Sequence, residues 1–154
     1  MPNKLSTPGS DRDALGAWAK RCYFAGRAMM EDALRPHGLG ATQYYVLHHL
    51  ATAGPTMQRD LVLALQIERA TLSAIITALV GKGLVRQEPD SVDQRQKKLR
   101  LTAGGERLWH DLPDLGFIRD AAFAGIPDAD IAIAVRVLRT ATERLDRRLN
   151  GETA

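Results

Sequence analysis

The segment that most constrains the fold of this chain is residues 84–102, LVRQEPDSVDQRQKKLRLT. Two short alternating stretches flank a polar middle from Pro89 to Gln94, whose residue types are typical of turns, so the segment predicts a β-hairpin with a long loop. Its basic residues are Arg86, Arg95, Lys97, Lys98 and Arg100. A hairpin of this size cannot bury so many charged side chains, so they must face water or a polyanion.

Helical patterns lie on both sides of the hairpin. Apolar residues recur at a helical period over 11–35, 41–53, 58–65 and 69–82, then from Thr102 to about Ala124 and from Asp128 to about Leu149. Pro113 and Gly116 predict a kink or break in the fifth pattern. Gly83 suits the C′ position, just after the fourth, and Asp128 can cap the last.

The order of these elements predicts the fold class. Two short helices joined by a turn at 66–68 and followed by a basic hairpin have the layout of a winged helix-turn-helix. We therefore predict a mainly α fold with a small β-wing, in which a winged helix-turn-helix at 39–102 is flanked by N- and C-terminal helices. Residues 11–154 would form a single domain after a disordered segment at 1–10.

Composition narrows the class of protein. A chain of 154 residues is long enough for one domain with a hydrophobic core. Residues 56–107 carry nine basic and six acidic residues whereas residues 108–154 carry six and eight, so the middle of the chain is the part suited to phosphate. Cys22 is the single cysteine, which excludes an internal disulfide and a cysteine-based metal cluster. The four histidines lack the spacing of a zinc site.

Several functions are not indicated by any motif. No apolar run approaches the roughly 20 residues of a membrane span, and the polar N-terminus lacks the apolar core of a signal peptide. We therefore expect a cytoplasmic protein without a membrane partner. No nucleophile–base set, glycine-rich phosphate loop or metal cluster is placed by a motif, so we expect neither an enzyme nor a bound cofactor.

The predicted helix 69–82 and the hairpin suggest how duplex DNA would be read. Small and hydrogen-bonding residues lie off the apolar stripe of the helix, which suits close approach to base edges in the major groove. Arg95, near the hairpin tip, suits the adjacent minor groove, and Asp93 would pair with it or cap the turn. Lys97 and Lys98 alternate along a strand, so only one can face DNA. The predicted DNA contacts are Arg69, Ala70, Thr71, Ser73, Ala74, Thr77, Arg86, Asp93, Gln94, Arg95, Lys97 and Lys98. The alternative is a solvated helix face beside a solvated charge run.

A wider pattern connects these elements to a known family. Its members are Leu39, Gln43, Val46, Leu47, Gly54, Pro55, Asp60, Leu61, Arg69, Thr71, Ser73, Gly83, Leu84 and Val85, then Asp93, Arg95, Leu101, Thr102 and Gly105 in the wing. With this pattern the chain resembles the MarR family of bacterial winged-helix repressors. The resemblance implies a homodimer on a palindromic operator, with 11–37 and 104–150 as dimerisation helices and a small ligand or oxidant as the releasing signal. The chain departs from the family pattern at Gln66, where a glycine is usual, and at Ala74, Thr77 and Gln94.

The apolar stripes of the first and last helices bear on whether the chain forms a dimer. A small reader domain alone does not cover them, so they pack within one chain or interlock between two. We favour the dimer, because a reader with one recognition helix gains affinity and half-site spacing by dimerising.

The resemblance also implies where an effector would bind, between the dimerisation helices and the reader. Candidate ligand residues there are Trp18, Arg21, Cys22, Tyr44, Tyr45 and His48. An aromatic acid would suit Arg21 beside Trp18, since a carboxylate needs a cationic partner and a ring needs an apolar wall. For each residue taken singly we favour a structural role, with Trp18, Cys22 and Tyr44 in the core and Arg21 in water.

The main prediction is therefore a dimeric, sequence-specific DNA-binding transcriptional regulator, a repressor released by a small aromatic acid. One alternative is an oxidant-sensing repressor, which requires an accessible, activated thiol at Cys22; a lone cysteine on an apolar stripe is more often a small buried hydrophobe. The other is a winged helix that binds proteins, which the weak charge of the recognition helix would suit.

Overall fold

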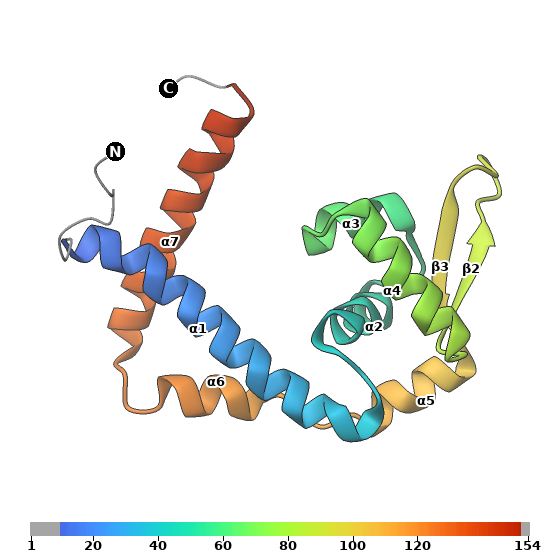
Figure 1. The fold of residues 1–154 in the computed structure, drawn as a ribbon, viewed down its shortest axis with the longest axis horizontal. Coiled ribbons are helices and arrows are strands. Elements are labelled where there is room, and N and C mark those ends of the chain that lie inside the picture. The colour runs from blue at the N-terminus through green and yellow to red at the C-terminus, as the bar shows by residue number, and fades with distance from the viewer. Residues whose placement is uncertain (1–9, 152–154) are drawn as a thin grey trace, which may run out of the picture. The chain divides into compact units, whose positions relative to one another are not determined.

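The structure is a computed structural model that describes residues 10–151 (Figure 1). Its helices are α1 (Asp11–Leu34), the 3-10 helix η1 (Arg35–His37), α2 (Ala41–Ala53), α3 (Gln58–Leu65), α4 (Arg69–Gly81), α5 (Ala103–Asp111), α6 (Gly116–Phe123) and α7 (Asp128–Leu149). Its strands are β1 (Thr56–Met57), β2 (Val85–Pro89) and β3 (Lys97–Leu101). The chain forms two compact units, one up to Ile118 and one from Arg119 onward. The segment predicted to be disordered lies almost entirely outside the described residues.

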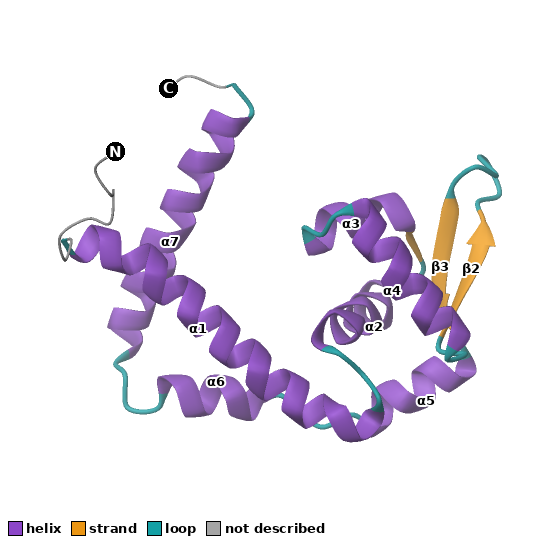
Figure 2. Ribbon diagram, in the orientation of Figure 1, coloured by secondary structure: helices purple, strands orange, loops and turns teal. Residues whose placement is uncertain are grey.

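The predicted fold class is confirmed: the described residues are mostly helical with one small sheet (Figure 2). The three strands are antiparallel in the order β1-β3-β2. Strand β1 is absent from the sequence prediction. It is two residues long, with Thr56 opposite Leu99, so it has no alternating pattern that a sequence could show.

The core of the first unit joins the end of α1 to the winged helix. Its fully buried side chains are Leu34, Val46, Leu47, Leu61, Leu72, Ile76, Leu79, Val85 and Leu99. They come from α1, α2, α3, α4 and both long strands, so a single cluster fixes the helix-turn-helix and the base of the wing. Burial of each such side chain contributes roughly 1.5–3 kcal/mol.

Polar contacts fasten α1 and α4 to the connection before α2. The Glu31 carboxylate on α1 accepts a hydrogen bond from the backbone N–H of Ala41 at 3.0 Å, which caps α2 from outside its own sequence. The ammonium of Lys82, just after α4, donates to the Gln43 side-chain oxygen at 3.0 Å and to the carbonyl of Gly38. The segment between α1 and α2 is therefore held from both sides.

The start of α5 locks the base of the wing. Thr102 is its N-cap, with Oγ1 accepting the N–H of Gly105 at 3.0 Å. Gly105 is buried against the backbone of Leu84, and a Cβ at this position would overlap the Leu84 carbonyl oxygen. The residue is a glycine because the helix and the strand entry leave no room for a side chain.

The helices after the wing follow the prediction with one correction. The predicted break is confirmed, since α5 ends at Asp111 and α6 begins at Gly116. The predicted cap by Asp128 is wrong. Pro127 occupies the N-cap position of α7 without a side-chain hydrogen bond, and Asp128 is the first helical residue, where its charge favours the positive end of the helix dipole.

The second unit, residues 119 onward, leaves its apolar side chains uncovered. No described residue from 119 to 151 is buried. Along α7 the exposed fractions reach 56% at Val135, 62% at Leu145 and 83% at Leu149. This helix carries a stripe that no other part of its own unit covers.

Candidate nucleic-acid interface

Helix α4 presents one polar face to solvent. The axes of α3 and α4 meet at 115°, within the range of helix-turn-helix motifs. The bend falls at Gln66, a non-glycine residue with φ 52° in the left-handed region. Leu72, Ile76 and Leu79 turn inward. The six α4 residues predicted to contact DNA are all exposed: Arg69, Ala70, Thr71, Ser73, Ala74 and Thr77.

The two faces of the wing are set by its register. Val85 pairs with Leu101 and Gln87 with Leu99, so these four share the face toward the helices. Pro89 pairs with Lys97, which places Lys97 on that same face.

The opposite face of the wing carries paired charges. Arg86 lies across from Arg100, and both guanidinium groups contact the Glu88 carboxylate, at 2.6 and 3.8 Å. Lys98 Nζ lies 3.8 Å from the Asp90 carboxylate. Of the two adjacent lysines, the helix-facing one is therefore Lys97, whereas Lys98 and Arg86 are ion-paired on the other face.

A groove of about 370 Å³ separates the helix-turn-helix from the wing. Its lining residues are Gln58, Arg59, Val62, Arg69, Ser73, Gln87, Arg95, Gln96 and Lys97. Four of these side chains are cationic and none is acidic. Within the described chain, Arg69, Arg95 and Lys97 make no ion pair within 4.0 Å, so they present unneutralised positive charge to the groove.

Aspartates organise the turn that carries Arg95. The Asp90 carboxylate accepts the backbone N–H groups of Asp93 at 3.1 Å and Val92 at 3.3 Å. These bonds, chiefly that from Asp93, lower the pKa of Asp90, and Lys98 acts in the same direction. The Asp93 carboxylate accepts the backbone N–H of Arg95 at 3.1 Å. Of the two predicted roles for Asp93, the described contacts show the turn cap rather than an ion pair with Arg95.

Sequence reasoning missed part of the groove. Gln58, Arg59, Gln87 and Gln96 line it, yet none stands in a pattern associated with DNA binding. Alternation along 85–89 does place Gln87 on the face of Val85. The position of Gln58 depends on how α3 is oriented, and no local pattern reports that.

The predicted ligand residues are distributed over separate places. Trp18 and Arg21 contact each other on α1, with the guanidinium 5.1 Å from the ring centroid. Trp18 is 62% exposed and Cys22 is exposed, so the interpretation that they belong to the core of this chain is wrong. The stripe looks internal in sequence, but the buried residues of α1 are Met30 and Leu34, both near its C-terminal end.

Two tyrosines of α2 face different surroundings. Tyr44 lies against His48 and Trp109, with ring centroids at 6.1 and 5.4 Å, and burial raises its pKa. Tyr45 lines a second groove, of about 430 Å³, between α1, α2 and the helix-turn-helix turn. The residues of this groove are Tyr23, Arg27, Thr42, Tyr45, Ala64, Leu65, Gln66 and Ile67. An arginine and two tyrosines line it, but the arginine is Arg27 and not the predicted Arg21.

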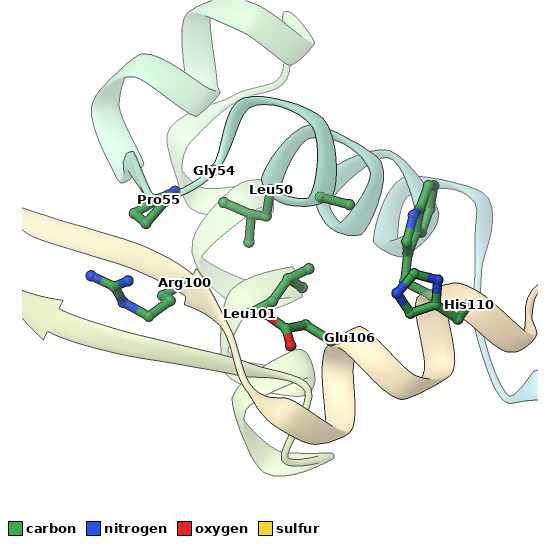
Figure 3. A pocket seen from close by; sticks show the side chains of 9 residues that line it. Leu50, Gly54, Pro55, Arg100, Leu101, Glu106 and His110 are labelled. Carbon is green, nitrogen blue, oxygen red and sulfur yellow. The ribbon is translucent and has the colours of Figure 1, made fainter.

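A third cavity, of about 400 Å³, lies between α2, β3 and α5 (Figure 3). Leu50 and Leu101 form its apolar part, and Arg100, Glu106 and His110 its polar edge. Because it holds both charges, it lacks the uniformly positive lining of the groove beside α4.

Comparison with known proteins agrees with this architecture. The MarR family model matches residues 37–96. The transcriptional repressor NicR of Pseudomonas putida is 27% identical over 103 residues, which cover 67% of this chain and 65% of NicR. The chain thus spans a little under two thirds of the length of this relative.

Solved structures extend the likeness beyond the matched segment. A cysteine-to-serine variant of MarR from E. coli, bound to operator DNA, has a TM-score of 0.77 at 21% identity, covering 88% of this chain and 99% of MarR. BpsR of Bordetella bronchiseptica, whose DNA binding is regulated by 6-hydroxynicotinic acid, has a TM-score of 0.73 at 26% identity, covering 84% of this chain and 98% of BpsR.

The fold and the groove define a winged helix-turn-helix protein. Over residues 37–96, which include the helix-turn-helix and most of the wing, the chain is similar to the MarR family. Among the described residues no single helix is long and apolar enough to span a membrane, although the bent pair α3 and α4 passes that test together by length and composition.

Proposed function

We propose that this protein is a sequence-specific transcriptional regulator that binds duplex DNA. The observation that carries the proposal is the groove between α4 and the wing, whose lining is positive and contains no acidic side chain. Duplex DNA places its phosphates on both sides of the major groove, so a reader helix flanked by unpaired cations gains electrostatic binding energy. Two similar proteins support the same function: NicR is a transcriptional repressor, and the MarR variant is bound to operator DNA.

Each element has a distinct role in this proposal. The exposed face of α4 enters the major groove, where Arg69 pairs with guanine or phosphate and the hydroxyls of Thr71, Ser73 and Thr77 bond bases or phosphate. Ala70 and Ala74 allow close approach to thymine methyl groups. Arg95, with Gln94 beside it, enters the minor groove from a turn that Asp93 caps. Lys97 contacts phosphate from the helix-facing side of the wing.

We propose that the functional form is a homodimer on a palindromic operator. Support comes from apolar side chains that each unit exposes separately. On α1, Trp18 is 62% and Phe24 53% exposed, and α7 has no buried residue. Such surfaces are expected to be covered by a second chain, and two reader helices would then contact half-sites about one DNA turn apart.

We propose that DNA binding represses transcription and is released by a small aromatic acid. The groove at Arg27 supports this, since Tyr23 and Tyr45 line it together with that arginine. Arg27 lies 3.4 Å from Glu31 and donates to Thr42 Oγ1 at 3.0 Å. A carboxylate that takes Arg27 would weaken its pairing with Glu31, the residue that caps α2. The ligand would thereby act on the connection between α1 and the reader.

An anisotropy titration tests the DNA-binding proposal. The probe is labelled duplex from the region upstream of the protein's own gene, at near-physiological salt with excess competitor duplex. We expect a competitor-resistant complex with two protomers per site, and a binding constant that falls linearly with salt on a log–log scale. A flat salt dependence would exclude DNA as the partner and favour the protein-binding alternative.

The same complex tests the effector. We expect 6-hydroxynicotinic or salicylic acid to lower the anisotropy of the wild-type complex and to lose that effect in Arg27→Gln. Arg21→Gln is the matched control, because Arg21 contacts Trp18 away from the groove. If Arg21→Gln abolishes release and Arg27→Gln does not, the effector site is at Trp18 instead.

A further inference from the structure

One side chain connects the recognition helix to the wing. Gln58 is the first residue of α3. Its Nε2 donates to Ser73 Oγ on α4 at 3.2 Å, and its Oε1 accepts from Gln87 Nε2 on β2 at 2.8 Å. Through these two hydrogen bonds the side-chain amide of Gln58 links α4 to the wing, two elements that would read different grooves of DNA.

The two sides of the groove that Gln58 connects both carry positive charge. Arg69 stands on the helix side of the groove and Arg95 and Lys97 on the wing side. Like charges facing each other across a groove repel until a polyanion enters. The neutral amide of Gln58 holds the two sides together without neutralising the cations that phosphate would need.

The bridge also directs the hydroxyl of Ser73. That oxygen accepts from Gln58, so its own O–H remains available to donate. Ser73 lies on the exposed face of α4. A hydroxyl fixed in this way presents a donor to DNA, whereas an unanchored one would rotate between donating and accepting.

We propose that Gln58 is a positioning and specificity-determining residue, which sets the spacing between the recognition helix and the wing so that one protomer reads adjacent major and minor grooves in a single register. The inference rests on the proposed DNA binding. Gln58 is outside the buried core, and both of its hydrogen bonds are exposed to solvent. Such bonds contribute little to folding, so the effect of losing them is on recognition.

The test compares Gln58→Met with wild type. Methionine has a similar length but makes neither hydrogen bond. Leu63→Met is the matched control, since Leu63 is 76% exposed on the same helix and does not line the groove. The specific probe is a duplex selected by the wild-type protein from a randomised library, and the non-specific probe is a duplex of scrambled sequence.

We expect Gln58→Met to bind the selected duplex roughly tenfold more weakly, because a wing out of register loses about one base contact, and to bind the scrambled duplex as wild type does. Leu63→Met should match wild type on both probes. Gln87→Met removes the wing half of the bridge and should reproduce the loss. In an Arg95→Ala background, Gln58→Met should cost much less, because the wing tip no longer reads a base step that needs registration.

Distinct outcomes overturn the proposal. Wild-type affinity in Gln58→Met, an equal loss on both probes, or strict additivity with Arg95→Ala would each show that Gln58 does not set the register. If Gln58→Met lowers the melting temperature, Gln87→Met decides, and wild-type affinity there refutes the bridge. If the wild-type protein enriches no sequence from the library, the proposed function and this inference fall together, whereas enrichment with an unaffected Gln58→Met overturns the inference alone.

Discussion

The two faces of the wing carry similar basic residues in different electrostatic states. On the outer face, Arg86 and Arg100 share Glu88, and Lys98 lies near Asp90. On the helix-facing side, Lys97 and the turn residue Arg95 line the groove beside α4 and have no acidic partner within 4.0 Å among the described residues. Only the second set has its full charge available to a polyanion.

This difference shows why the number of cations in a hairpin is a poor guide to its function. Exposed ion pairs such as that between Arg86 and Glu88 add little to stability, with a median of about 0–1 kcal/mol. Their acidic partners do, however, reduce the local positive potential. The strand alternation that separates Lys97 from Lys98 therefore also separates a surface suited to DNA from one that is internally balanced.

The largest expected effect comes from breaking the base of the wing, which both faces share. In Gly105→Ala the new methyl group would overlap the carbonyl of Leu84. We expect the free energy of unfolding to fall by about 3 kcal/mol, at the upper end for overpacking, because the obstacle is backbone and cannot rotate away. Urea denaturation measures this. Gly81→Ala is the control, since a Cβ there has no neighbour within 4 Å and should cost no stability. Equal stability of the two variants would show that the backbone at Leu84 can move to make room for the methyl group.

The next largest effect is expected from comparing arginine substitutions on the two faces of the wing. Arg95→Ala should leave folding intact and weaken operator binding roughly tenfold to a hundredfold, the range for loss of a base-contacting arginine. Arg100→Ala removes an arginine from the outer face, where it pairs with Glu88, and should change affinity little. Anisotropy titrations of both variants make the comparison. A greater loss in Arg100→Ala than in Arg95→Ala would assign DNA binding to the outer face.

A smaller effect tests adjacent residues of identical chemistry. Lys97→Ala should lower the slope of log affinity against log salt by about one, as expected for the loss of one phosphate contact, and weaken binding similarly on all sequences. Lys98→Ala should leave the slope unchanged, because Lys98 lies on the face that carries Asp90 and Glu88. Salt titrations on a single duplex suffice. Equal slopes for both variants would mean that DNA does not distinguish the faces.

Much of the fold could be predicted from local patterns. The bounds of α2 and α3 coincide with the predicted 41–53 and 58–65, because the apolar residues of both helices keep a helical period and Gly54-Pro55 ends α2. Strand β1 could not be predicted, since its two residues are defined by pairing with β3. The cap of α7 was assigned to the wrong residue because aspartate is favourable both at the cap and in the first turn.

The candidate site was predictable only where one element carries it. Helical periodicity placed Arg69 and Ser73 on an exposed face, and turn chemistry placed Arg95 near the hairpin tip. Gln58 and Arg27 were missed because each acquires its neighbours from elements far away in sequence, Gln87 for one and Tyr45 for the other. Tertiary contacts of this kind leave no local period.

The smallest expected effect concerns the turn that joins the two faces. Because the backbone N–H of Asp93 donates to the carboxylate of Asp90, the pKa of Asp90 lies below its ordinary value of 3.8. A lowered folded-state pKa means that the contribution of this group to stability is complete above the unfolded pKa and is lost as the pH falls through the folded one. NMR titration of the side-chain carboxyl should show this lowered midpoint, with the amide signals of Val92 and Asp93 shifting together with it. In Asp90→Asn the amide signal of Val92 should no longer follow this titration, while the wing remains paired. A midpoint at or above 3.8 would mean that these hydrogen bonds do not hold the turn, and Arg95 would then lack the fixed support on which the contrast between the faces depends.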